Sequence, residues 1–301
     1  MTIRAFSFAF AAFLALTPIA SPAPAQTASA DPIRVGVLDD ACAALDPMPA
    51  IVADYMKRYA AAKAGDQPPP PVTAAGMKIY SDWQDNLKAE DFPGLCRYRA
   101  ANAALPTATD HRVILFGDSI TELWQDIDPG LFTGDWLDRG ISGQTTEQML
   151  IRFRADVIAL KPAVVQIMAG TNDIAGNTGP TTLSEIEDNI SSMVDLAKAH
   201  HIRVVLASVP PAASFGWRPG IDPRKSIAAL NVWLRAYAVR EKLNYVDYHD
   251  ALKTDGGAFR PELTKDGVHP NAAGYKVMRS LLEKAIPRAG HSGRRRFPVG
   301  K

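Results

Sequence analysis

The chain has 301 residues, enough for one sizeable domain with an extension, and its 47% hydrophobic content is ordinary for a globular protein. The formal net charge is +1, but residues 1–25 carry +1 and residues 287–301 carry +5, so residues 26–286 carry −5. This mildly acidic body is not typical of a nucleic-acid-binding protein, and no nucleic-acid partner is expected.

Residues 1–25 have the pattern of a secretory signal peptide. Arg4 supplies the positive start, residues 5–16 are apolar, and the small residues at 23–25 predict cleavage after Ala25. The apolar run is shorter than the roughly 20 residues of a membrane-spanning helix, and no later run is long enough. The mature protein is therefore expected to be exported and to have no membrane span, with the periplasm favoured over full secretion.

Residues 26–110 are predicted to form a mainly helical N-terminal extension, with helices over 49–63 and 95–105. No catalytic pattern occurs in this extension, so packing against the main domain is the favoured interpretation. Cys42 and Cys96 are expected to form a disulfide in an oxidising compartment, the alternative being two separate buried thiols. Neither cysteine has metal-ligand spacing with a neighbour, and we expect no metal and no other cofactor.

Residues 111–287 alternate between short apolar runs and amphipathic segments. This pattern predicts a flavodoxin-like three-layer α/β/α fold with a five-stranded parallel sheet of order 2-1-3-4-5. The strands are predicted at 113–116, 136–141, 164–169, 203–208 and 244–248, and the helices at 120–126, 145–160, 181–200, 224–242 and 271–286. The basic segment 288–301 is expected to be a disordered tail.

Polar motifs follow the first three predicted strands. Ser119 follows the first strand in Gly-Asp-Ser-Ile, Gly143 follows the second in Ser-Gly-Gln-Thr, and Asn172 follows the third in Gly-Thr-Asn-Asp. His269 lies in Asp-Gly-Val-His-Pro before the last helix. Because the carboxyl ends of parallel strands meet at one edge of a sheet, the first three motifs are expected to converge there.

A serine hydroxyl becomes nucleophilic when a base removes its proton. His269 is the candidate base for Ser119, and Asp266 is placed to accept the other ring N–H and so orient the imidazole. His249 is a rival base, but the acids around it have less suitable spacing. Asp118 and Asp173 are interpreted as structural residues that hold loop N–H groups, and Asp247 as a capping residue.

These four blocks, in this order and spacing, resemble the SGNH (GDSL-type) hydrolase superfamily over residues 111–286. The sequence Gly-Asp-Ser-Ile-Thr-Glu-x-Trp is most similar to the branch of platelet-activating-factor acetylhydrolase-like proteins and carbohydrate acetyl-esterases. The resemblance implies an oxyanion hole formed by the backbone N–H groups of Ser119 and Gly143 and the side-chain amide of Asn172.

The loop after the fourth predicted strand is a candidate substrate wall. Phe215 and Trp217 are suited to an apolar or sugar-stacking surface, and Arg218 to a polar headgroup, although packing against the extension is an equal alternative. Trp124 is also expected near the mouth of the site. No long apolar tunnel is evident, which favours short acyl chains.

Together these features predict an exported, metal-free serine esterase that acts on small-molecule or saccharide esters, preferably O-acetyl or other short acyl groups, through an acyl-enzyme. Three alternatives remain open. They are a lipid hydrolase of lysophospholipase or thioesterase type, a sugar O-acyltransferase with the same triad, and a catalytically inactive glycan-binding module. The sequence does not determine the oligomeric state.

Overall fold

The structure is a computed structural model that describes residues 37, 39–61 and 73–286. The predicted signal peptide (1–25) and basic tail (288–301) lie outside the described residues. The chain divides into two units, residues 1–44 and residues 45–301. Within the described part of the first unit, a 3-10 helix covers Ala41–Ala44. Cys42 and Cys96 are each in the disulfide-bonded state rather than free thiols.

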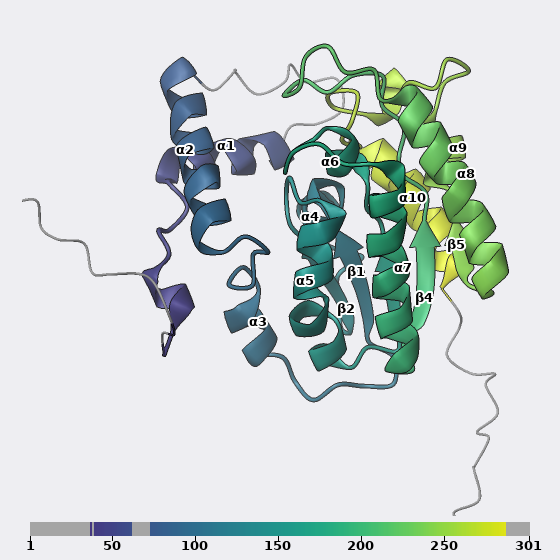
Figure 1. The fold of residues 1–301 in the computed structure, drawn as a ribbon, viewed down its shortest axis with the longest axis horizontal. Helices are drawn as coiled ribbons and strands as arrows, with labels where there is room; N and C mark the ends of the chain where they lie inside the picture. The colour runs from purple at the N-terminus through teal and green to yellow at the C-terminus, as the bar shows by residue number, and fades with distance from the viewer. Residues whose placement is uncertain (1–36, 38, 62–72, 287–301) are drawn as a thin grey trace, which may run out of the picture. The chain divides into compact units, whose positions relative to one another are not determined.

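Five parallel strands in the second unit form one sheet in the order β2-β1-β3-β4-β5 (Figure 1). Both the strand number and the order agree with the sequence prediction. The strands are β1 (Val113–Gly117), β2 (Trp136–Gly140), β3 (Val164–Ile167), β4 (Arg203–Ala207) and β5 (Asn244–Val246).

Helices cover both faces of the sheet, because alternate strand residues point to opposite sides. Ile114 and Phe116 of β1 belong to one core cluster, which they share with three helices: α5 (Thr146–Asp156), α7 (Leu183–Ala199) and α8 (Arg224–Glu241). Val113 and Leu115 belong to the other cluster, which contains α4 (Ser119–Ile127), α9 (Tyr248–Leu252) and α10 (Ala272–Ala285). In Figure 1, α5 and α7 lie in front of the strands and α10 lies behind them.

Short elements complete this α/β/α domain. A helix α6 (Thr171–Ile174) follows β3, and two 3-10 turns cover Ile158–Leu160 and Pro261–Leu263. The helix predicted over 145–160 is too long, since α5 ends at Asp156 and a separate 3-10 turn follows. A capping box begins α7, with Thr182 and Glu185 satisfying each other's backbone N–H groups.

Three helices precede the sheet: α1 (Ala50–Ala61), α2 (Ala74–Glu90) and α3 (Arg99–Ala103). The sequence analysis predicted α1 and a longer version of α3 but missed α2. A start signal for α2 exists at Thr73, whose hydroxyl accepts a hydrogen bond from Gly76 N at 3.1 Å. Among the described residues, none of the helices combines the length and the apolar composition needed to cross a bilayer.

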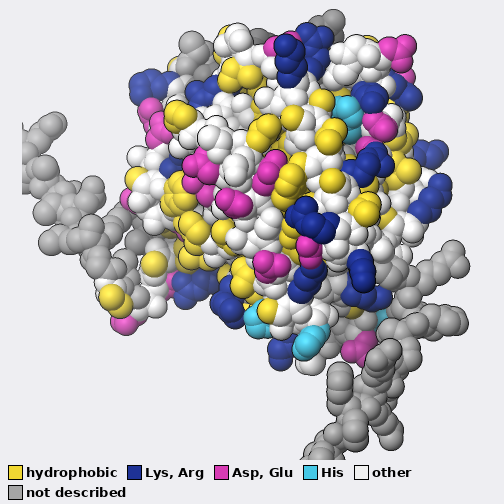
Figure 2. Space-filling view, turned by 45° about the vertical axis from the view of Figure 1, so that its right-hand side comes forward, with side chains coloured by type: hydrophobic (Ala, Val, Ile, Leu, Met, Phe, Trp, Pro, Cys, Tyr) yellow, Lys and Arg dark blue, Asp and Glu magenta, His cyan; other side chains and the backbone are white. Residues whose placement is uncertain are grey.

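Acidic and basic side chains are intermixed on the face that Figure 2 brings forward. This face therefore shows no broad surface of a single charge, in keeping with the small net charge of the chain. Hydrophobic side chains lie between the charged groups, as is normal for a protein surface.

Candidate active site

The candidate nucleophile lies where β1 passes directly into α4. Asp118 is the N-cap of α4, and its Oδ1 accepts a hydrogen bond from Ile120 N at 2.9 Å, which fixes the turn that presents Ser119. The neighbouring strand β2 allows close packing here. A Cβ at Gly140 would lie 2.2 Å from the backbone nitrogen of Glu122, so only glycine lets α4 approach β2 this closely.

Ser119, His269 and Asp266 form a continuous hydrogen-bonded chain. The Oγ of Ser119 lies 2.9 Å from Nε2 of His269, and Nδ1 of His269 lies 2.8 Å from Oδ2 of Asp266. The other carboxylate oxygen of Asp266 accepts from the backbone N–H groups of Val268 and His269, at 2.9 and 2.8 Å. The loop before α10 thus fixes the acid, the acid orients the imidazole, and the imidazole faces the serine.

The charges around His269 favour the protonated form of its ring. Burial alone would lower the pKa of His269, but the negative charge of Asp266 and its hydrogen bond raise this pKa above the ordinary value of 6.5. Asp118 also lies close enough to favour the protonated ring. Burial raises the pKa of Asp118 itself to about 6.

The two backbone N–H groups predicted for the oxyanion hole belong to Ser119 and Gly143. Within the described residues, neither Ser119 N nor Gly143 N donates a hydrogen bond to another protein group. Gly143 has a φ of 80°, a conformation that other residues rarely adopt, and this turns the peptide between Ser142 and Gly143. The two predicted backbone donors therefore have no competing acceptor in the described structure.

The third predicted donor, Asn172, is buried and already hydrogen-bonded. Its Nδ2 donates to Oδ2 of Asp118 at 3.2 Å and to the carbonyl of Gln144 at 3.0 Å. Its Oδ1 accepts from Nδ2 of Asn177 at 2.9 Å, and Asn177 also donates to the carbonyl of Gly143 at 3.0 Å. Sequence reasoning missed Asn177, because nothing in its local pattern distinguishes it from an ordinary loop residue.

The three residues predicted for the substrate wall occupy different environments. Trp217 is 40% exposed, and its ring centroid lies 6.4 Å from that of His269. Phe215 is buried under it, with ring centroids 5.0 Å apart, so Phe215 supports the wall rather than lining it. Arg218 donates to the carbonyl of Gly176 at 3.3 Å. Nε1 of Trp217 donates to Oδ1 of Asn177 at 3.0 Å, which ties the wall to the Gly143 loop.

The prediction that Trp124 lies near the mouth is wrong. Its side chain is fully buried and packs against the ring of Tyr275 at 5.2 Å. The reason is helical spacing, since Trp124 shares a face of α4 with Ile120 and Leu123, and this face turns toward the core formed with α10.

The remaining candidates occupy supporting positions. The nearest acid contact of His249 is with Asp250 at 3.5 Å, whereas His269 is the ring that faces Ser119. Asp173 accepts from the backbone N–H and the hydroxyl of Thr146, and Asp247 caps α9, as predicted for both acids. No cluster of three or more His, Cys, Asp or Glu side chains suited to a metal occurs in the part of the chain that the structure describes.

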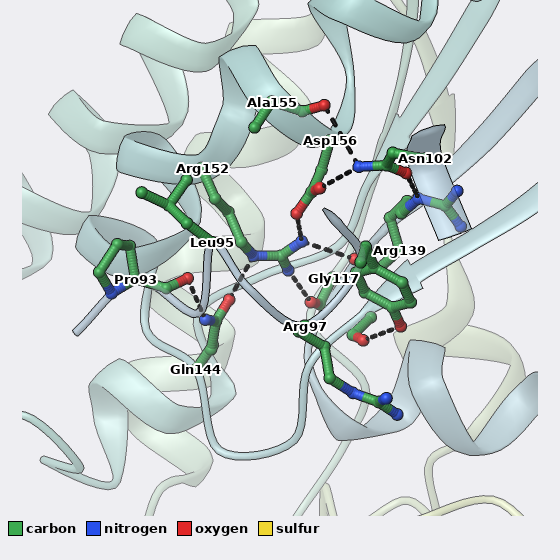
Figure 3. A network of polar contacts seen from close by, with 12 residues as sticks. Pro93, Leu95, Arg97, Asn102, Gly117, Arg139, Gln144, Arg152, Ala155 and Asp156 are labelled. Atoms are coloured by element: carbon green, nitrogen blue, oxygen red, sulfur yellow. Dashed lines mark hydrogen bonds and ion pairs between the residues drawn. The ribbon is translucent and has the colours of Figure 1, made fainter. Parts of the chain in front are cut away.

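A buried arginine holds the strand ends beneath the site (Figure 3). Arg152 of α5 is fully buried and donates to the carbonyls of Gly117 at 2.9 Å and Arg139 at 3.0 Å. It also contacts Gln144 at 2.5 Å and forms an ion pair with Asp156 at 3.1 Å. One side chain thus joins the end of β1, the end of β2 and the loop that follows β2.

A three-layer α/β/α domain with these four motifs at the carboxyl edge of its sheet defines a hydrolase of the SGNH class. The GDSL-like lipase/acylhydrolase family matches residues 115–277, and the chain belongs to this family. It is an ester hydrolase of the GDSL type.

Individual relatives agree with this assignment. The chain is 28% identical to the isoamyl acetate-hydrolyzing esterase of Saccharomyces cerevisiae over 205 residues, which are 58% of this chain and 85% of the yeast protein. It is 30% identical over 151 residues to the esterase TesA of Pseudomonas aeruginosa, covering 50% of this chain and 67% of that protein. The crystal structure of a GDSL-like lipase from Bacteroides thetaiotaomicron matches with 44% identity and a TM-score of 0.63, covering 65% of this chain and 98% of that one.

Proposed function

We propose that the protein is a serine esterase that hydrolyses short-chain carboxylic esters through an acyl-enzyme on Ser119. The observation that carries the proposal is the chain from Ser119 Oγ to His269 Nε2 (2.9 Å) and from His269 Nδ1 to Asp266 Oδ2 (2.8 Å). This is the arrangement in which a base activates a serine and an acid orients the base.

The first half of the reaction forms the acyl-enzyme. Ser119 Oγ attacks the ester carbonyl while His269 Nε2 takes its proton, and Asp266 stabilises the resulting imidazolium. The N–H groups of Ser119 and Gly143 donate to the developing oxyanion. Asn172 can join them by turning one N–H from its present acceptors toward that oxygen.

The second half of the reaction releases the acid. As the tetrahedral intermediate collapses, His269 gives its proton to the departing alcohol. A water molecule then attacks the acyl-enzyme, with His269 again taking a proton and returning it to Ser119 Oγ as the carboxylic acid leaves.

Acetyl or similarly short acyl groups are the proposed substrates. The yeast relative is named for hydrolysis of an acetate ester, and this chain covers most of its length. The exposed ring of Trp217 beside His269 offers a flat apolar surface of the kind on which a sugar ring or a short alkyl alcohol packs. A saccharide O-acetyl group therefore fits the proposal.

We further propose that the enzyme is exported, with the periplasm as the expected location. The support comes from the signal-peptide pattern of residues 1–25 and from the disulfide-bonded state of both cysteines. Disulfides persist in oxidising compartments such as the periplasm.

The test is hydrolysis of p-nitrophenyl esters from acetyl to palmitoyl by the wild-type protein and by Ser119→Ala. Highest kcat/KM on acetyl, lost in Ser119→Ala, would support the proposal. A preference for palmitoyl, also lost in Ser119→Ala, would keep the nucleophile but move the function to lipids. Absence of turnover on every ester would overturn the hydrolase mechanism, leaving acyl transfer or glycan binding for direct assay.

A further inference from the structure

A segment outside the family-matched region reaches the loop that carries Gly143. This segment, residues 92–98, precedes β1 and is here called the N-terminal strap. The carbonyl of Phe92 accepts from Nε2 of Gln148, and the carbonyl of Pro93 accepts from Nε2 of Gln144, both at 2.7 Å. Figure 3 shows the second of these contacts beside the buried Arg152. The strap therefore lies against Gln144, which directly follows Gly143, and against Gln148 in the first turn of α5.

Arg97 of the strap extends this contact toward the site through an acid of α4. Its Nη2 lies 2.7 Å from Oε1 of Glu122, and its Nε lies 3.3 Å from the same oxygen. The other oxygen, Oε2 of Glu122, accepts from the backbone N–H of Ser142 at 2.8 Å and from the Ser142 hydroxyl at 2.5 Å. Arg97, Glu122 and Ser142 thus form a relay that ends one residue before Gly143.

This relay holds one side of the peptide whose N–H faces the oxyanion. Glu122 anchors Ser142, and on the other side Asn177 donates to the carbonyl of Gly143 at 3.0 Å. The positive φ of Gly143 allows this orientation of its N–H, and the anchors on both neighbouring peptide groups hold it. An oxyanion donor must be in place before the charge develops, so its orientation affects the chemical step.

Arg97 supplies the charge that keeps Glu122 in this role. The Glu122 side chain is only 17% exposed, so its carboxylate has little water to stabilise it. The guanidinium, itself half-exposed, compensates that charge and occupies the oxygen that Ser142 does not use. Without this guanidinium, the Glu122 carboxylate is expected to rotate toward solvent, and that rotation weakens its hydrogen bonds to Ser142.

We infer that Arg97 is a positioning residue for ester hydrolysis, which acts through Glu122 and Ser142 to orient the Gly143 N–H. The N-terminal strap is then part of the working enzyme and not only a layer packed on the domain. This inference rests on the proposed function, because it assigns Gly143 to the oxyanion hole.

The test compares Arg97→Gln, Arg97→Lys and Glu122→Gln with the wild type on p-nitrophenyl acetate. Arg97→Gln and Glu122→Gln should lower kcat about 10-fold with little change in KM, since the ground-state ester needs no oxyanion donor. The inhibition constant of a trifluoromethyl ketone, which forms a tetrahedral oxyanion on the serine, should rise by a similar factor. Arg97→Lys should recover most of the rate because it restores the positive charge.

Arg279→Gln is the matched control, because Arg279 of α10 also forms ion pairs at a partly exposed position, in its case with Asp128 and Glu283. It should leave kcat and the inhibition constant unchanged. Unchanged kcat in both Arg97→Gln and Glu122→Gln, or a rise in KM alone, would overturn the inference while loss of activity in Ser119→Ala still supported the esterase. Full activity in Ser119→Ala would instead overturn the proposed function.

Discussion

The hydrogen bond between His269 and Asp266 determines the pH at which the serine can be activated. His269 accepts a proton from Ser119 only when its ring is neutral, and Asp266 raises the pKa of His269 above 6.5. We therefore expect kcat/KM to fall as the pH drops through a value above 6.5 and to level off at higher pH. A pH–rate profile with p-nitrophenyl acetate measures this value directly.

Asp266→Asn is the control for that assignment. The amide would donate toward Nδ1 and so favour the tautomer that carries its proton on Nε2, which cannot accept from Ser119. We expect kcat to fall by about 10⁴-fold, as loss of the orienting acid does in other triads. A variant with near-normal kcat and an unchanged pH profile would show that Asp266 does not orient the base.

Asn172 joins the candidate oxyanion hole to the turn that presents Ser119. Asn172→Ala removes the side-chain donor along with its bonds to Asp118 and Gln144, and we expect kcat to fall by about 10²–10³-fold. Active-site titration with a fluorophosphonate should still label Ser119 to completion, so that the loss is read per folded molecule. A loss of stability with no change in kcat per labelled site would make Asn172 purely structural.

At the scale of elements, the sequence predicted the features that depend on short-range patterns of residues. Apolar runs and amphipathic segments identified all five strands and their order, and the Ser119, Gly143, Asn172 and His269 blocks lie at one sheet edge. What it missed depends on long-range packing. Helical spacing places Trp124 on the same face of α4 as Ile120 and Leu123, but only the packing of α10 shows that this face is buried. The role of Arg97 requires α4 and the loop after β2 to be in place.

The contacts of Arg152, which join α5 to the ends of β1 and β2, give a test of packing between elements. Arg152→Met keeps an apolar stem against Phe116 but removes the donors to the ends of β1 and β2 and leaves Asp156 without its cation. We expect a loss of about 3–5 kcal/mol in the free energy of unfolding, measured by urea denaturation, because breaking a buried pair leaves an uncompensated charge.

Arg154, an exposed residue two positions along the same helix, gives the matched control for this change. Arg154→Met should alter the free energy of unfolding by no more than about 0.5 kcal/mol. Equal losses in the two variants would mean that the buried contacts of Arg152 contribute nothing to stability. Both losses would then come from the change in helix propensity and charge that the two substitutions share.

At the scale of the whole molecule, a buried acid should make the free energy of unfolding depend on pH. Asp138 of β2 is buried on the sheet face that α4 covers, and the Tyr98 hydroxyl of the strap lies 3.5 Å from its Oδ1. Burial raises the pKa of Asp138 to about 8, even though Gly140 N donates to its Oδ1 at 2.7 Å. The folded protein then holds a proton at Asp138 that the unfolded chain releases near pH 4. Asp138 therefore favours folding less and less as the pH rises from about 4 to about 8.

Asp138→Asn removes this titration while its amide oxygen can still accept from Gly140 N. The variant should gain stability relative to the wild type as the pH is raised from 5 to 8, and urea denaturation at both pH values measures the change. Asp82→Asn, at an exposed position on α2, should show no such trend. If the difference between Asp138→Asn and the wild type were the same at pH 5 and pH 8, Asp138 would have to be ionised in the folded protein throughout this range. Its negative charge would then be accommodated by Arg139 and Arg152, both of which stabilise the ionised form, and the sheet edge would be held together by charge rather than by a buried neutral acid.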